Sequence, residues 1–507
     1  MELLPNGAKT SESRLLLEEH PMAAIEHNAE IPAQPSRRQT LGTPHLLFFV
    51  VAAAAPVGFV LSAVPLAIGR GGIGTVGAFI VTAVVLLLFA VGFVAMAQRV
   101  QQVGGLYEFV VEGIGRVPGV GAAYVAVATY ALAAIGATGA FAVFADIASQ
   151  DLLGFEAPWI VWALGVAALM GVFGILRIEA NAKILGAIIV VEIAMLLIVA
   201  CVIVWQGGAE GPSIAPWQPK EVFGGHSGAM FAVTFAAFAG FEATAIYSDE
   251  VKNKRSIARA TFLVIVALAA LYSFVTWALI TAYGNIGAVS AAATDPTTMF
   301  FTATQTYVGT WAVRIFEVLI VASWFASILA FHNATARYLA TMGSNGMAPK
   351  WLNTIRRKSG TPWKASVSHT ALTFVVITAF AVFDGDPFLD LYILGSTPAI
   401  IGIPLLELLA GIAIICYFYR RTPSRTRTVV LVTSGLAAAC LAAVIAAIIA
   451  NIELFTARTG AANVIVSALM FLLFLGGMAW ALLRRDHTTP HSAHPRSSPD
   501  QHNQESS

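Results

Sequence analysis

Long apolar stretches constrain this chain more than any other feature of its sequence. Between two polar tails, each of these stretches is long enough to cross a lipid bilayer as a helix, which takes about 20 residues. They run on without the alternation of a half-exposed strand, so helices are favoured. We predict twelve transmembrane helices in an all-α polytopic membrane protein, at residues 46–68, 77–97, 119–147, 158–176, 182–205, 227–250, 261–283, 311–341, 365–383, 389–418, 428–450 and 461–483.

The composition excludes most other classes of protein. Hydrophobic residues make up 58% of the chain and charged residues 11%, whereas a soluble domain carries about 25% charged residues. The net charge of +1 offers no attraction to a polyanion. The three cysteines lie far apart in apolar runs, which argues against a disulfide framework or a Cys-based zinc site. We therefore expect no nucleic-acid partner, metal or cofactor, and the chain shows no nucleophile–base pattern of an enzyme.

The basic residues predict the orientation. With the N-terminus in the cytoplasm, the twelve spans place 25 of the 29 Lys and Arg residues inside, as the positive-inside rule requires. We expect a multi-pass protein of the cell membrane with both termini cytoplasmic. Residues 1–44 and 486–507 are polar and rich in Pro, Ser or His, so they are predicted to be disordered cytoplasmic tails.

Two predicted helices carry interruptions at their centres. In the first, Pro56 removes an amide donor and Gly58 lets the backbone open. In the sixth, Gly240 stands two residues before the acidic Glu242. These helices would be the first of two five-helix repeats, 46–205 and 227–418, followed by two extra helices in 428–483. Paired interruptions of this kind point to a transporter's binding site at the repeat interface.

Interrupted helices expose backbone groups that suit a zwitterion. Half-helix N-termini offer amides to an anion and half-helix C-termini offer carbonyls to a cation, so an amino acid fits both ends. The simpler interpretation is that such kinks only serve helix packing. We predict substrate binding by Ala54, Ala55, Val57, Gly58, Phe238, Ala239, Gly240 and Phe241.

Three ordered motifs show a family resemblance. Gly240, Phe241 and Glu242 lead into an acidic pair, Asp249 and Glu250, and an Arg-rich helix start. The other two motifs are Gly104-Gly105-Leu106-Tyr107 after the second helix, and His332 to Tyr338 followed by Gly346 to Trp351 at the end of the eighth. In these features, over roughly residues 45 to 485, the chain resembles the amino acid permeases of the amino acid–polyamine–organocation superfamily.

The resemblance implies a fold and a mechanism. The fold would be two inverted repeats of five helices plus two C-terminal helices, within a transporter domain at 45–485. Alternating access would proceed around the broken first and sixth helices, with an aromatic side chain of the sixth closing over the substrate. The chain departs from the family at Pro56, which removes a donor from the carboxylate site. It also has Glu192 near the place where some relatives carry a basic residue on the fifth helix.

Several charged residues are candidates for proton coupling or gating. Glu242 and Glu192 lie mid-membrane, where a charged carboxylate is costly unless it is paired, hydrated or protonated. Each could carry a coupling proton, and each could instead only form a structural hydrogen bond. Arg337 and His332 end the eighth helix and could latch an inner gate to Asp249 or Glu250, although snorkelling to lipid headgroups would explain them too. Glu407 could line the inner half of the pathway.

Together these features favour a secondary active transporter. We predict a proton-coupled carrier of an amino acid, working by alternating access in the lipid bilayer. A carrier of an amine or polyamine without a carboxylate is the alternative, because Pro56 weakens the anion site. A permease-like solute sensor that signals through its tails is a second alternative, of a different class. An ion channel is disfavoured, because no charged ring or repeated filter sequence occurs.

Overall fold

The structure is a computed structural model that describes residues 43–100, 105–176, 178–224, 227–242, 255–356, 359–421, 425–456 and 458–484. Every described residue belongs to the contact unit Arg38–Ser507. The predicted gating pair Asp249 and Glu250 and nearly all of both predicted tails lie outside the described ranges.

Within these ranges the regular secondary structure is helical. Nine segments are long and apolar enough to cross a membrane, which agrees with a polytopic membrane protein. They are α4 (Thr75–Ala97), α6 (Arg116–Leu153), α8 (Ile178–Gln206), α11 (Arg255–Tyr283), α14 (Thr310–Ser344), α15 (Trp363–Val382), η5 (Pro387–Leu394) continued by α16 (Gly395–Arg421), α17 (Arg425–Ala450) and α19 (Ala461–Leu483).

The first predicted span is a broken one. It comprises α1 (Thr43–Ala54), α2 (Pro56–Ser62) and α3 (Val64–Gly71). The chain bends by 51° between Val50–Ser62 and Val64–Gly71, just before Pro65, which cannot donate a helical hydrogen bond. The sequence predicts the interruption at Pro56, and the second bend at Pro65 is an additional break that was not predicted.

Two predicted spans correspond to shorter helices. These are α7 (Trp159–Gly174), with 16 residues, and α10 (Ser227–Ala236), with 10 residues. Their crossing of the membrane, and with it the count of twelve, stays a prediction. The remaining elements are short: α5 (Leu106–Gly113), η1 (Ala215–Trp217), α9 (Pro219–Val222), α12 (Asn285–Thr294), α13 (Met299–Tyr307), η4 (Lys350–Asn353) and α18 (Ile452–Thr456).

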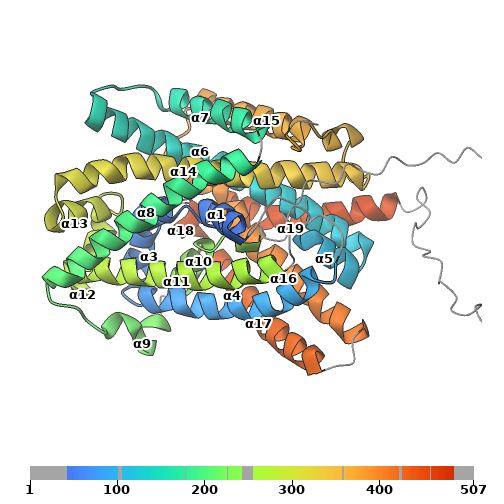
Figure 1. Cartoon of the computed structure of the whole chain (residues 1–507), viewed down its shortest axis with the longest axis horizontal. Coiled ribbons are helices and arrows are strands. Elements are labelled where there is room, and N and C mark those ends of the chain that lie inside the picture. Colours follow the sequence, from blue (N-terminus) through green and yellow to red (C-terminus); the bar gives the residue numbers. More distant parts are fainter. Residues whose placement is uncertain are drawn as a thin grey trace, which may run out of the picture. The chain divides into compact units, whose positions relative to one another are not determined.

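The broken first span lies inside the bundle (Figure 1). Helix α1 packs against α8, α11 and α14, while α10 packs against α3, α4 and α17. Helix α6 packs against α14, α16 and α19. Glycines allow some of these close approaches, since a β-carbon on Gly477 of α19 would lie 2.9 Å from the α-carbon of Gly121 of α6. Small residues at helix interfaces are typical of membrane bundles.

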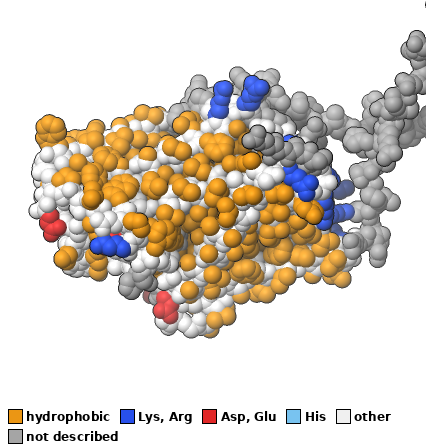
Figure 2. Space-filling view, turned by 90° about the horizontal axis from the view of Figure 1, so that it is seen from below, with side chains coloured by type: hydrophobic (Ala, Val, Ile, Leu, Met, Phe, Trp, Pro, Cys, Tyr) orange, Lys and Arg blue, Asp and Glu red, His pale blue; other side chains and the backbone are white. Residues whose placement is uncertain are grey.

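The surface is suited to lipid. Figure 2 shows hydrophobic side chains spread broadly over the face in view, with most of the visible Lys and Arg side chains toward one end. Large apolar side chains on several helices are exposed, among them Val84, Leu197 and Val375. A soluble monomer rarely exposes such extended apolar area, so the chain is a multi-pass membrane protein.

Candidate functional site

The first interruption lies where the sequence predicts it. Ala55 separates α1 from α2 and adopts the left-handed conformation, with φ of 44°. This conformation costs a residue with a β-carbon about 1–2 kcal/mol. Pro56 follows at the first position of α2, where its missing amide removes no helical hydrogen bond. The site therefore begins with a strained junction between two short helices.

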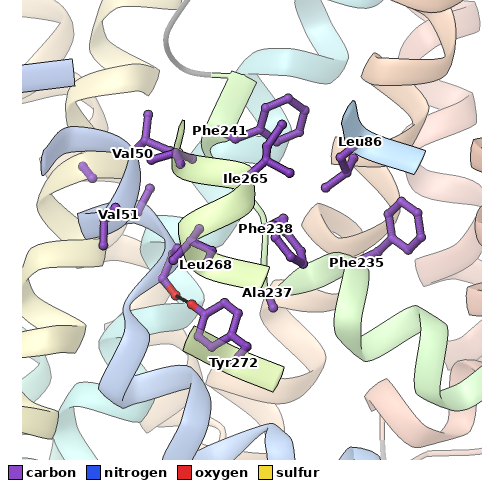
Figure 3. Packing of buried hydrophobic residues seen from close by; sticks show 14 of the residues in the cluster. Val50, Val51, Leu86, Phe235, Ala237, Phe238, Phe241, Ile265, Leu268 and Tyr272 are labelled. Atoms are coloured by element: carbon purple, nitrogen blue, oxygen red, sulfur yellow. Dashed lines mark hydrogen bonds between the residues drawn. The ribbon is translucent and has the colours of Figure 1, made fainter. Parts of the chain in front are cut away.

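Side chains from two neighbouring helices satisfy the carbonyls at the end of α1. The hydroxyl of Ser327 on α14 donates to the carbonyl of Ala53 at 3.0 Å. The hydroxyl of Tyr272 on α11 donates to the carbonyl of Ala54 at 3.3 Å, the contact drawn as a dashed line in Figure 3. Both carbonyls belong to the C-terminal end of α1, and a helix C-terminus attracts positive charge.

The amides at the start of α2 are also satisfied within the protein. The Val57 amide donates to Glu192 Oε2 of α8 at 3.3 Å, and the Gly58 amide donates to Ser323 Oγ of α14 at 3.2 Å. Ser323 in turn donates to the same Glu192 oxygen at 2.9 Å. Glu192 is fully buried, and its other oxygen has no partner among the described residues. The predicted coupling residue Glu192 therefore caps the first interruption.

The second interruption follows α10. After Ala236 the backbone forms turns, and Gly240 has φ of 103°. Glu242 accepts hydrogen bonds from the Gly240 amide at 3.0 Å and from the Tyr130 hydroxyl of α6 at 2.5 Å. Glu242 is 1% exposed. This acid therefore holds the end of the broken sixth span to α6.

The aromatic residues beside the second interruption have three different environments. Phe238 packs against Tyr272 and Phe79, and Phe241 packs against Phe89 and Phe93. Figure 3 shows the Phe238 ring next to Tyr272, with Phe241 on the other side of Ile265. Neither lines the cavity described next, whereas Phe235 does.

A cavity of about 160 Å³ lies between the two interruptions. Of the predicted substrate-binding residues, Ala54, Ala55 and Ala239 line it, while Val57, Gly58 and Gly240 do not. The other described lining residues are Ala53, Phe59, Ala63, Leu66, Ala133, Ala137, Val233, Phe235, Ala236, Trp324, Ser327, Phe331, Tyr392, Ile393, Ser396, Ala399, Ile400, Ile403, Pro404, Glu407, Leu454 and Phe455.

The predicted inner latch lies only partly within the described residues. His332 is buried and shares a hydrogen bond with His369 of α15 at 2.8 Å, and another with Ser366 at 2.8 Å. Arg337 is 5% exposed and donates to the Asn333 carbonyl at 3.4 Å. Their proposed acidic partners lie outside the described ranges.

Some residues of this site escaped the sequence analysis. Ser323 and Ser327 lie four residues apart on one face of α14, which was a usable signal for a polar contact. Tyr130 offered only a weaker signal, one hydroxyl among several in its predicted span and directly after Thr129. Trp324 lines the cavity but looked like any membrane tryptophan.

A sequence model of the family described as amino acid permease matches residues 41–482. The chain belongs to the amino acid permease family. A search of curated proteins finds no match to the permease. Members of this family are transporters of amino acids or related organic cations.

Proposed function

We propose that this permease is a secondary active transporter that carries a small amino-bearing solute by alternating access and is driven by protons rather than sodium. The observation that carries the proposal is the cavity bounded by both interrupted helices, with Ala54 and Ala55 on one side and Ala239 on the other. Solute in this cavity would contact backbone that is not held in a continuous helix.

The hydrogen bonds around the first interruption support alternating access. Helix α2 is attached to α8 and α14 by the Val57 and Gly58 amides, and α1 is attached to α11 and α14 by two carbonyls. A single net hydrogen bond contributes about 0.5–1.5 kcal/mol. Contacts of this size can be exchanged when the bundle rearranges.

Buried acids support proton coupling. Glu242 is held by the Tyr130 hydroxyl, and Tyr130 stacks on Tyr338 with ring centroids 5.3 Å apart. Tyr338 in turn lies 6.0 Å from Tyr107 of α5. This column of tyrosines leads from the second interruption to α5, which lies outside the long apolar helices.

Glu108 stands at the far end of that column. It accepts a hydrogen bond from the Asn345 side chain at 3.2 Å, and the same Asn345 donates to the Tyr107 hydroxyl at 3.3 Å. Burial raises the pKa of Glu108 to about 7. A group that titrates near neutral pH is suited to proton exchange.

Counterflow in proteoliposomes tests transport without an assumption about the coupling ion. Vesicles are preloaded with amino acids, amines and polyamines, and uptake of one labelled solute at a time is measured. We expect accumulation of one solute class, lost in Gly240→Leu, which obstructs the contact between the interrupted helices. Absence of counterflow for every solute with folded protein would contradict the proposal and favour the sensor alternative.

The driving ion requires a second experiment. An acidic exterior should raise accumulation of the exchanged solute, and replacing sodium by choline should leave it unchanged. Glu242→Gln should keep counterflow and lose the response to the pH gradient. Uptake that needs sodium and ignores the pH gradient would contradict proton coupling while leaving transport intact.

A further inference from the structure

The anion site expected at the first interruption is already occupied by the protein. The first two free amides of α2 donate to Glu192 and Ser323, and Pro56 has no amide to offer. A helix N-terminus is a natural place for a carboxylate. Here the carboxylate is a side chain of the permease itself, so a substrate carboxylate would have to displace a buried acid.

The cavity wall carries no positive charge. Among its described lining residues there is no Lys, Arg or His. The two lining serines, Ser327 and Ser396, donate their hydroxyls to the carbonyls of Ala53 and Tyr392. The indole nitrogen of Trp324 is buried without a partner among the described residues. Two neutral donors, the indole of Trp324 and the hydroxyl of Tyr392, are not enough to replace the hydration of a carboxylate in apolar surroundings.

An acidic side chain does face the cavity. Glu407 of α16 is the single acidic residue among the described lining residues, and it is 2% exposed. Glu242 accepts two hydrogen bonds, whereas no described residue donates one to Glu407. Glu407 is therefore the acid that gains most from a cation entering the cavity.

Aromatic rings complete an environment for a cation. The cavity is lined by six of them, and Trp324 and Tyr392 meet edge-on with centroids 5.0 Å apart. Aromatic faces attract ammonium groups, and the gain reaches about 2 kcal/mol in desolvated sites. The six rings belong to Phe59, Phe235, Trp324, Phe331, Tyr392 and Phe455.

We propose that the cavity binds a small organic amine that carries an ammonium group and no carboxylate, with Glu407 as its counter-ion. The cavity volume of about 160 Å³ suits a short monoamine better than an extended polyamine. This inference rests on the proposed transport function and names the substrate class of the same site.

Matched pairs of solutes test the inference in the unmodified protein. Serine is compared with ethanolamine and valine with isobutylamine, because the members of each pair differ by a carboxylate. Binding to the purified permease is measured by thermal stabilisation and by equilibrium binding of the labelled solute. We expect each binding amine to be at least about tenfold tighter than its amino acid, the scale of one charge-assisted contact.

Two variants test the counter-ion. Glu407→Gln keeps the shape of the side chain and removes its charge, so amine affinity should fall at least about tenfold. Glu453→Gln, an exposed acid of α18 outside the cavity, is the matched control and should bind like the unmodified protein. Unchanged amine affinity in folded Glu407→Gln would overturn the assignment of Glu407.

The results separate this inference from the transport proposal. Tighter binding and counterflow of the amino acids would overturn the inference and leave transport standing. Amine binding without any counterflow would contradict transport and support the site. If Glu407→Gln did not fold, the matched pairs in the unmodified protein would still decide the question. If neither amine bound to the unmodified protein, the inference would be overturned.

Discussion

Gly240 and Ala53 meet where the two interrupted helices approach each other. A β-carbon on Gly240 would lie 2.5 Å from the β-carbon of Ala53, closer than two carbons can approach. Gly240 also has φ of 103°, a conformation that residues with a β-carbon rarely adopt. The first and sixth spans are therefore in contact through a position that accepts only glycine.

Gly240→Ala is expected to impair both stability and transport. The backbone strain and the overlap together should lower the free energy of unfolding by about 2–4 kcal/mol, because neither backbone can withdraw without moving its helix. Counterflow should fall in parallel. The measurements are the melting temperature in detergent and counterflow in proteoliposomes.

Gly476→Ala provides the control for this change. A β-carbon there would meet no atom within 4 Å, and the residue lies on the exposed face of α19. It should melt and transport like the unmodified protein. A normal melting temperature and normal counterflow for Gly240→Ala would show that the contact between the two spans is not required.

The sequence predicted those features of the fold that residue type decides locally. Bilayer thickness sets the length of an apolar helix, so nine of the predicted spans coincide with long apolar helices among the described residues. Pro56 breaks the first span through its own ring, and Ala55 takes the strained conformation beside it. The second bend could have been predicted in the same way, because Pro65 follows it directly and also lacks an amide donor.

The partners across the bundle could not be predicted. Glu192 lies 135 positions from Val57, and Tyr130 lies 112 positions from Glu242. Such contacts depend on how helices pack, which periodicity does not report. The turns after α10 also decide which phenylalanine faces the cavity. For that reason Phe235 lines it while Phe238 packs against Tyr272.

Glu192 should be required as a hydrogen-bond acceptor for α2. Glu192→Leu would leave the buried Val57 amide unpaired, which costs about 1–3 kcal/mol, whereas Glu192→Gln keeps an acceptor oxygen. We expect the Leu variant to melt at a lower temperature than the Gln variant, as measured by thermal unfolding in detergent. Equal melting temperatures for the two variants would show that the cap at Val57 contributes nothing to stability.

Tyr130→Phe should separate proton coupling from solute exchange. The change removes the hydroxyl that donates to Glu242 at 2.5 Å and leaves the ring that stacks on Tyr338. Counterflow should persist, and accumulation driven by a pH gradient should fall at least about tenfold, since a hydrogen bond to a charged group is worth roughly 1.5–3 kcal/mol. Both rates are measured in the same vesicles.

Tyr124→Phe is the matched control on α6. It removes a hydroxyl that donates to the Met347 carbonyl at 3.1 Å, away from the cavity-lining residues. Its pH response should be unchanged. An equal loss of pH response in both variants would indicate a general effect on α6 and not a role of the hydroxyl at Glu242.

Glu108 should make the stability of the permease fall as the pH rises toward neutral. Burial raises its pKa from 4.5 to about 7 in the folded chain, so the folded state keeps this proton at pH values where the unfolded chain has lost it. The stabilisation is fully present below pH 4.5 and is lost as the pH passes 7.

Glu108→Gln removes this contribution. Melting temperatures of the unmodified protein and of Glu108→Gln are compared from pH 5 to pH 8. The melting temperature of the unmodified protein should decline relative to that of Glu108→Gln as the pH rises. The control variant Glu453→Gln should behave like the unmodified protein. A constant difference between the unmodified protein and Glu108→Gln over this range would mean that Glu108 does not titrate there, and would remove the proton acceptor at the end of the tyrosine column.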